Sequence, residues 1–194
     1  FVEIERQLGL SEKIEKIEVY DNSHIQGKFP VGCLVSLDQN GYRKSDYRKF
    51  NLKDENINPG DDLGIMKHVL QRRFNKTPEL SMEKGENLPD LIVIDGGKNQ
   101  LNIAEEVLNQ LDLKKIPVIS IAKGIKRNSG NEEFYFKGRV ISFPKNSSIL
   151  FFFQRIRDEA HRFAIGTHRK KRSSSVNKSE LDNVFGIGPK KKKE

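Results

Sequence analysis

Three segments rich in β-branched and aromatic residues lie close together in the first part of the chain, at 17–22, 31–37 and 42–50. Segments of this composition predict strands. A turn signal, QNG at 39–41, separates the second segment from the third. Because consecutive strands with short connections usually pair with one another, we expect an antiparallel meander.

Two predominantly apolar runs follow later, LIVID at 91–95 and PVISIA at 117–122. Runs of this kind predict central strands that are covered on both faces. Between them, Leu101, Ala104 and Leu108 recur at helical spacing. A strand–helix–strand unit has a right-handed crossover, so we expect these two strands to be parallel.

Helical periodicity also marks two segments that begin at capping residues. The first starts at Asp61 or Asp62, and its apolar positions are Leu63, Met66, Leu70 and Phe74. The second starts at Ser147 or Ser148, and its apolar stripe consists of Ile149, Phe152, Phe153, Ile156, Ala160, Phe163 and Ala164.

A two-residue hairpin is predicted over 133–143, between these two helices.

The predicted order of elements is three strands, helix, strand, helix, strand, hairpin and helix. Three antiparallel strands followed by parallel strands with interleaved helices are typical of the ribonuclease-H-like arrangement. We therefore expect an α/β fold with a ribonuclease-H-like mixed sheet flanked by helices. The composition of 173–180, SSSVNKSE, is that of a linker, so the domain is expected to cover 1–172 and an appendage 173–194.

The composition excludes several classes of protein. Hydrophobic residues make up 35% and charged residues 32% of the chain, which still leaves enough apolar runs for a core. The longest unbroken apolar runs have about five residues, far too few to span a bilayer, so no membrane partner is expected. The one cysteine, Cys33, excludes a disulfide framework and a cysteine-based zinc site. In its apolar strand we expect a buried, inert thiol, as in a cytoplasmic protein.

The positive charge is concentrated at one end of the chain. The net charge is +8, and from Arg169 to the end nine basic residues stand against three acidic ones, so +6 lies there. Such an appendage can hold a nearly neutral body to a polyanion such as nucleic acid. We expect Arg169, Lys170, Lys171 and Arg172, which extend the last helix, to contact phosphates. A solvated basic tail would have the same composition.

Two aspartates close predicted strands. Asp21 ends the first strand, and Asp95 ends the central one. If these strands are neighbours, a strand spacing of about 5 Å brings both carboxylates within reach of one Mg²⁺ or Mn²⁺. A single aspartate after a strand is usually structural, but two at one end of a sheet predict a metal site. Asp62, at a helix start, is a candidate third carboxylate.

Three further residues are candidates for the chemistry of this site. His161 and Arg157 lie together on the border of the apolar stripe, where a side chain is held firmly and still reaches solvent. Beside two carboxylates His161 is a candidate metal ligand or general acid–base, although a lone helical histidine is more often structural. Lys98 follows Gly96 and Gly97 at a strand-to-helix turn that can contact a phosphate. The alternative is a tight turn with a solvated lysine.

Several segments, in the same order, resemble the UvrC family, the incision subunit of bacterial nucleotide excision repair. They lie between residue 15 and the end of the chain, and together they are far more specific than any one of them. The matching segments are IEVYDNSHIQG, YRKFN, GDDLGIMKHVLQRRF, LPDLIVIDGGKNQL, IPVISIAKG, QRIRDEAHRFAIGTHRKKR and FGIGPKK.

The resemblance implies a ribonuclease-H-like endonuclease domain that uses a divalent cation, Mg²⁺ or Mn²⁺, and cuts 5′ to a lesion in double-stranded damaged DNA. Matched motif by motif, it implies catalytic roles for Asp21, Asp62, Asp95 and His161, and metal ligation by all of these except Asp62. It also implies a bacterial cytoplasmic protein whose partner, a damage-recognition helicase subunit, binds segments outside this chain. FGIGP resembles the opening of a helix-hairpin-helix module, so 173–194 is expected to hold a linker and a truncated start of that module.

We therefore expect hydrolysis of a DNA phosphodiester, with Lys98, Arg157 and residues 169–172 positioning the backbone without reading its sequence. Asn22 stands where the family pattern has an aliphatic residue, but no proposed catalytic group is lost. Two alternatives remain. One is a non-catalytic DNA-binding module on the same fold, and the other is a different ribonuclease-H-like enzyme, such as a resolvase or an RNA–DNA hybrid nuclease.

Overall fold

The computed structural model of the chain forms two compact units, Phe1–Ala164 and Ile165–Glu194. The first unit holds the sheet and the helices that cover it. Of the second, the structure describes a helical backbone that ends at Val176. The described backbone covers residues 1–25, 29–52, 57–58, 60–75, 88–122 and 132–176.

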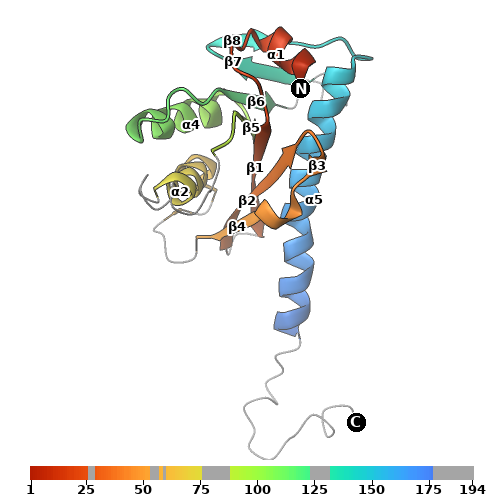
Figure 1. The fold of residues 1–194 in the computed structure, drawn as a ribbon. Helices are drawn as coiled ribbons and strands as arrows, with labels where there is room; N and C mark the ends of the chain where they lie inside the picture. Colours follow the sequence, from red (N-terminus) through yellow and green to blue (C-terminus); the bar gives the residue numbers. More distant parts are fainter. Residues whose placement is uncertain (26–28, 53–56, 59, 76–87, 123–131, 177–194) are drawn as a thin grey trace, which may run out of the picture. The chain divides into compact units, whose positions relative to one another are not determined.

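The strands of the first unit form one eight-stranded mixed sheet (Figure 1). They are β1 (Lys16–Ile25), β2 (Phe29–Asp38), β3 (Gly41–Tyr42), β4 (Arg48–Asn51), β5 (Leu91–Asp95), β6 (Val118–Ala122), β7 (Glu133–Phe136) and β8 (Arg139–Ile141). Their order is β3-β2-β1-β5-β6-β7-β8, and β4 also pairs with β2. The pairs β1–β5 and β5–β6 are parallel, and the other pairs are antiparallel. The expected ribonuclease-H-like mixed sheet is confirmed.

The expected third strand, 42–50, is wrong as a single element. The chain pairs with β2 twice, as β3 and as β4, and forms a 3₁₀ turn, η1 (Lys44–Asp46), in between. Side chains stabilise this turn. Arg43 forms an ion pair with Asp46 at 3.0 Å, and the Arg48 guanidinium donates to the Ser45 carbonyl at 2.7 Å. The partial alternation of this segment therefore reflects two short strands on the same edge of β2.

Helices cover both faces of the sheet (Figure 1). They are α1 (Val2–Leu8), α2 (Asp62–Phe74), α4 (Lys98–Gln110) and α5 (Ser148–Val176). Alternating residues of β1 belong to two separate cores. Val19 packs with residues of α1 and α5, whereas Tyr20 packs with residues of α2 and α4. The short helix α1 has no counterpart among the sequence predictions. Among the described helices, none is both long enough and apolar enough to cross a membrane.

Both long-helix starts agree with the sequence predictions. Asp61 caps α2, since its carboxylate accepts from the Gly64 amide at 2.8 Å. Ser147 caps α5, since its hydroxyl accepts from the Leu150 amide at 3.3 Å. The predicted two-residue hairpin is also present. Lys137 and Gly138 connect β7 to β8 with φ values of 46° and 72°, the left-handed conformations that such a turn requires.

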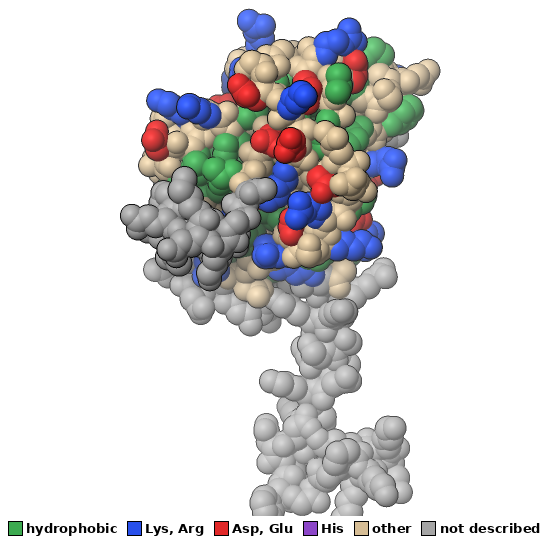
Figure 2. All heavy atoms as spheres, viewed as in Figure 1, with side chains coloured by type: hydrophobic (Ala, Val, Ile, Leu, Met, Phe, Trp, Pro, Cys, Tyr) green, Lys and Arg blue, Asp and Glu red, His purple; other side chains and the backbone are tan. Residues whose placement is uncertain are grey.

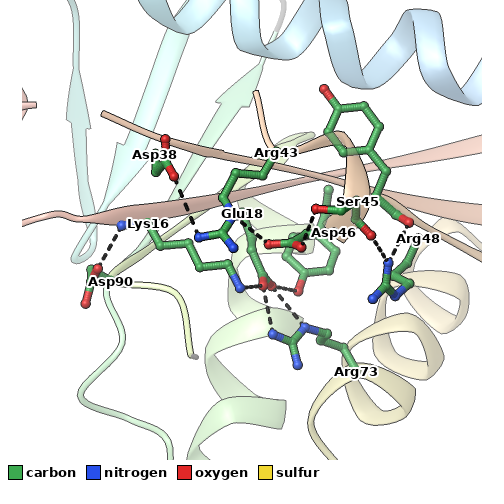
Figure 3. Close-up of polar contacts among 11 residues, drawn as sticks. Lys16, Glu18, Asp38, Arg43, Ser45, Asp46, Arg48, Arg73 and Asp90 are labelled. Atoms are coloured by element: carbon green, nitrogen blue, oxygen red, sulfur yellow. Dashed lines mark hydrogen bonds and ion pairs between the residues drawn. The ribbon is translucent and has the colours of Figure 1, made fainter. Parts of the chain in front are cut away.

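A buried ion cluster ties α2 to β1 (Figure 3). The Glu18 side chain is 1% exposed and forms ion pairs with Lys16 at 3.0 Å and with Arg73, in the last turn of α2, at 2.8 Å. The Tyr20 phenol donates to the same carboxylate at 2.7 Å. Burial, and then the negative charge of Glu18, raise the pKa of Tyr20 well above its ordinary value. The C-terminal end of α2 is thereby fixed to the sheet.

The surface charge of the first unit is mixed. Figure 2 shows basic and acidic side chains interspersed over the visible face, with apolar side chains between them. This agrees with a chain in which +6 of the net +8 lies beyond residue 168. The helical backbone of α5 continues past residue 172 and ends at Val176.

Candidate active site

Three side chains from three elements meet at one place on the sheet. They are Asp21 of β1, Asp95 at the end of β5 and His161 of α5. One ligand atom from each lies within 4.8 Å of the other two, and among the described residues no other group of three or more metal-ligating side chains does so. His161 Nδ1 lies 3.2 Å from Asp21 Oδ2.

The parallel pairing of β1 with β5 brings the two aspartates together. Tyr20 is paired with Ile94, and Asp21 and Asp95 are each the next residue along their strands. Because side chains alternate along a strand, both carboxylates lie on the face that α5 covers. The expectation that these strands are neighbours is therefore confirmed.

Helical phase brings His161 to the same place. Ala160 and Ala164 are fully buried against the sheet, and His161 lies at the border of that buried stripe. Its side chain is 54% exposed, whereas that of Asp21 is 6% exposed. The group thus has a buried end at Asp21, a partly exposed carboxylate at Asp95 and an imidazole that reaches solvent.

The donor set fits a divalent cation. Two carboxylates this close repel each other unless a cation or a proton lies between them. Carboxylate oxygen suits Mg²⁺ and Mn²⁺, and imidazole nitrogen suits transition metals such as Mn²⁺ more than Mg²⁺. Asp21, Asp95 and His161 are therefore the residues that could hold such an ion.

Cys33 lies directly beside the group but is not part of it. It pairs with Asp21 across β1 and β2, and its thiol donates to the Ala160 carbonyl at 3.4 Å. Burial, followed by the negative charge of Asp21, raises the pKa of the Cys33 thiol to about 12. The thiol therefore stays protonated near neutral pH, as expected for a buried, inert cysteine.

Asp62 lies near the group without joining it. It is exposed at the first position of α2, and its carboxylate is not among the three clustered ligands. Its main-chain carbonyl accepts from the Asn22 side-chain amide at 3.2 Å, and Asn22 is the residue after Asp21. Gly32, opposite Asn22 on β2, allows α2 to lie close to the sheet, since a Cβ there would lie 2.2 Å from Val69 Cγ2 of α2.

The turn after Asp95 is held by its own helix. The Gln100 side chain accepts from the Gly97 amide at 2.8 Å, which satisfies the N-cap amide at the start of α4. A Cβ at Gly96 would lie 1.7 Å from Gln100 Oε1, so a larger residue there would displace the Gln100 side chain from this bond. Because the Gly97 amide is used in this way, the exposed Lys98 side chain is the better candidate for a phosphate contact.

Arg157, a predicted phosphate contact, forms ion pairs within the protein. Its side chain is 14% exposed and forms ion pairs with Glu132 at 3.1 Å and Asp158 at 3.0 Å. Burial alone lowers the pKa of Arg157, but hydrogen bonds to Asp158 and Glu132 outweigh it and raise that pKa. Arg157 is thus held by protein carboxylates one helical turn before His161. The side chains of residues 169–172 lie outside the described part of the chain.

Glu132 is a residue that the sequence analysis did not single out. Its carboxylate is 4% exposed and accepts from Gln154 at 3.0 Å as well as from Arg157. It thereby fixes the polar side of α5 on the approach to His161. No sequence signal marks it, because it stands in a polar segment that lacks periodicity.

The matching solved structures have low sequence identity and TM-scores below 0.5. Endonuclease V of Ciona intestinalis, in complex with an inosine-containing DNA, matches with a TM-score of 0.42 and 16% identity over 58% of this chain and 48% of that one. Argonaute of Marinitoga piezophila, in complex with a guide RNA and a target DNA, matches with a TM-score of 0.37 and 16% identity over 69% and 21%.

The sequence relatives are much closer. UvrABC system protein C of Hyphomonas neptunium is 46% identical over 98% of this chain, and that of Paramagnetospirillum magneticum is 48% identical over 95%. The chain spans 32% and 30% of the length of these two relatives. The family model for the UvrC RNase H endonuclease domain matches residues 5–165, which include Asp21, Asp95 and His161. The chain belongs to the UvrC RNase H endonuclease domain family.

Proposed function

We propose that this domain is a metal-dependent DNA endonuclease whose catalytic cation, Mg²⁺ or Mn²⁺, is held by Asp21, Asp95 and His161. The observation that carries the proposal is the convergence of these three side chains, from β1, β5 and α5, within 4.8 Å. A histidine and two carboxylates with graded exposure suit an ion that must also meet a substrate.

The three ligands differ in what they can do. Asp21 is buried between β2 and α5, so its carboxylate has a fixed position. Asp95 is half-buried at a strand end, where a phosphodiester can approach it. When bound, a divalent cation supplies Lewis-acid chemistry, which polarises the phosphodiester and makes water a better nucleophile.

His161 and Asp62 have supporting roles in the proposal. As an alternative to binding the metal, His161 can take up or release a proton at the reacting oxygen, with its contact to Asp21 orienting the ring. Asp62, which Asn22 links to β1, assists from the start of α2. Lys98, three residues after Asp95, and residues 169–172 are proposed to bind backbone phosphates without reading sequence.

The proposed substrate is double-stranded damaged DNA, cut 5′ to the lesion during nucleotide excision repair in the bacterial cytoplasm. Support comes from the UvrABC system proteins to which the chain is similar and from the endonuclease family to which it belongs. A damage-recognition helicase subunit of the same system is the proposed partner. It would bind segments of the full protein other than this domain, which is about a third of the relatives' length.

Asp95→Asn tests the proposal in a reconstituted excision reaction. The substitution keeps the shape of the side chain and removes its charge, so 5′ incision should be lost while the thermal unfolding curve keeps its shape. Asp90→Asn is the matched control. Asp90 precedes the same strand, and its carboxylate accepts from the Glu15 and Lys16 amides, both at 2.9 Å. Because Asp90 is outside the metal-ligand group, the Asp90→Asn variant should incise at the wild-type rate. Incision at the wild-type rate by Asp95→Asn would overturn the assignment.

Two other functions are distinguished by related measurements. A non-catalytic DNA-binding module would bind DNA in a salt-dependent manner and would incise neither with nor without Asp95. A different ribonuclease-H-like nuclease would prefer a junction or an RNA–DNA hybrid over a damaged duplex. Nicking of the three substrates, compared side by side, separates these cases.

A further inference from the structure

A single cross-strand row of the sheet extends from the metal-ligand group to an exposed lysine. Cys33 of β2 pairs with Asp21 on one side and with Lys49 of β4 on the other. The side chains of directly paired residues lie on the same face of a sheet. Lys49, Cys33 and Asp21 therefore form one row, and the parallel strand β5 adds Asp95 beyond it.

One stretch of α5 contacts every member of this row. His161 Nδ1 lies 3.2 Å from Asp21, and the Ala160 carbonyl lies 3.4 Å from the Cys33 sulfur. The Lys49 ammonium lies 4.1 Å from the centre of the Phe163 ring. The row thus ends on a cation that is held above an aromatic ring two residues from His161.

The ring that supports Lys49 is itself held in place. Tyr47 packs edge-on against Phe163, with 4.9 Å between ring centres, and its hydroxyl donates to Glu159 at 3.0 Å. A cation–π contact with a fixed ring restricts a long side chain that would otherwise sample many rotamers. Lys49 is an exposed residue, and yet its ammonium has a defined place beside the ring.

Lys49 and Asp21 are separated along the row by Cys33. Two strand spacings separate the backbones of Asp21 and Lys49, which is about 10 Å. A DNA strand carries one negative charge for about every 3.4 Å of helix axis. A strand with one phosphate at the carboxylates would therefore bring a neighbouring phosphate within reach of Lys49.

We propose that Lys49, supported by Phe163, binds a phosphate of the incised strand next to the scissile one. The inference rests on the proposed function, since it takes the scissile phosphate to lie at Asp21 and Asp95. It adds a positioning residue on the β4 side of the site, opposite Lys98, which lies on the β5 side. The ammonium acts as a point charge and reads no base.

DNA binding by the chain, measured by fluorescence anisotropy without divalent metal over a range of salt concentrations, tests the proposal. Lys49→Met removes the charge and keeps the aliphatic stem, so the slope of log Kobs against log[salt] should become smaller by about 0.9. Lys49→Arg keeps the charge, so its slope should equal that of the wild type. Lys137→Met is the matched control, because Lys137 is also exposed and lies 5.2 Å from a ring centre, that of Phe136, but in the β7–β8 turn. Its slope should be unchanged.

Each result decides one question. An unchanged slope for Lys49→Met, with normal Asp95-dependent incision by the wild type, would overturn the inference alone. A smaller slope together with wild-type incision by Asp95→Asn would overturn the proposed function and leave a phosphate contact. An unchanged slope together with weaker Mn²⁺ binding by Lys49→Met would show that Lys49 serves the carboxylates and would also overturn the inference.

Discussion

The Nδ1 atom of His161 lies 3.2 Å from Oδ2 of Asp21, although the two residues are 140 positions apart in the sequence. One partner is nearly buried and the other is half exposed. The imidazole can donate a proton to the carboxylate, or the two can share a cation, but one nitrogen cannot do both. A metal that binds through Nδ1 therefore requires the tautomer with no proton on that nitrogen.

Asp21→Asn should abolish stabilisation by metal. A ligand that binds only the folded state at 100 times its dissociation constant adds about 2.7 kcal/mol to the free energy of unfolding. We expect Mn²⁺ to raise the melting temperature of the wild-type chain and to leave that of Asp21→Asn unchanged, as measured by circular dichroism. Without metal, the variant should be no less stable than wild type, because repulsion with Asp95 is relieved. Asp46→Asn, outside the group, should respond to Mn²⁺ as wild type does, and an equal response from Asp21→Asn would contradict the site.

Gly32→Ala should push α2 away from the sheet. The new Cβ would lie 2.2 Å from Val69 Cγ2, and overpacking of this kind costs about 1–3 kcal/mol. Urea unfolding should show this loss in the free energy of unfolding. Val69→Ala in the same chain removes the clash, so the double variant should lose less than the sum of the two single variants. Simple additivity would show that Gly32 and Val69 are not in contact.

Glu18→Gln should destabilise the fold strongly. The substitution leaves Lys16 and Arg73, which are 12% and 11% exposed, without their buried counterion. Removal of one partner from a buried ion pair costs about 3–5 kcal/mol. Glu3→Gln is the control, because the Glu3–Arg6 pair is largely exposed and its loss should not change the melting temperature measurably. Similar small effects for both variants would mean that the cluster contributes little.

The outline of the sheet and the strand end at Asp95 were open to prediction, because burial on both faces leaves a strong mark on composition, whereas β1 continues past Asp21 to Ile25. LIVID and PVISIA could only be central strands, and Asp95 follows the first of them directly. A period of 3.6 residues also put His161 at the edge of the α5 stripe. These inferences concern local sequence, where propensity and packing act together.

Pairwise contacts between distant segments were not open to prediction. Nothing in the pattern shows that Lys49 shares a row with Asp21, because register depends on how β4 meets β2 after the 3₁₀ turn. Glu132 gave no signal, and its ion pair is the reason that Arg157 is largely withdrawn from solvent. Asp62 follows the N-cap residue by one position, and helix geometry alone does not say whether its carboxylate joins the other two.

The tyrosines should resist ionisation in the folded chain. All four have a raised pKa, mainly through burial at Tyr20, Tyr42 and Tyr47 and through the hydrogen bond to Glu133 at Tyr135. Because the folded-state pKa values lie above the unfolded value of about 10, their contribution to stability is full below pH 10 and is lost as the pH rises further. Absorbance at 295 nm should show less phenolate at pH 10 in the folded chain than in urea, where about half of the tyrosines ionise. Equal titration curves would contradict the burial of Tyr20.

The central claim is that Asp21, Asp95 and His161 hold the catalytic cation, and a crystal soaked in Mn²⁺ tests it most directly. Anomalous scattering at a wavelength where manganese absorbs locates the ion without reference to activity. We expect an anomalous manganese peak bounded by the two carboxylates and the imidazole, at a coordination distance of about 2 Å from the carboxylate oxygens. A strong manganese peak elsewhere, with none near Asp21 and Asp95, would contradict it.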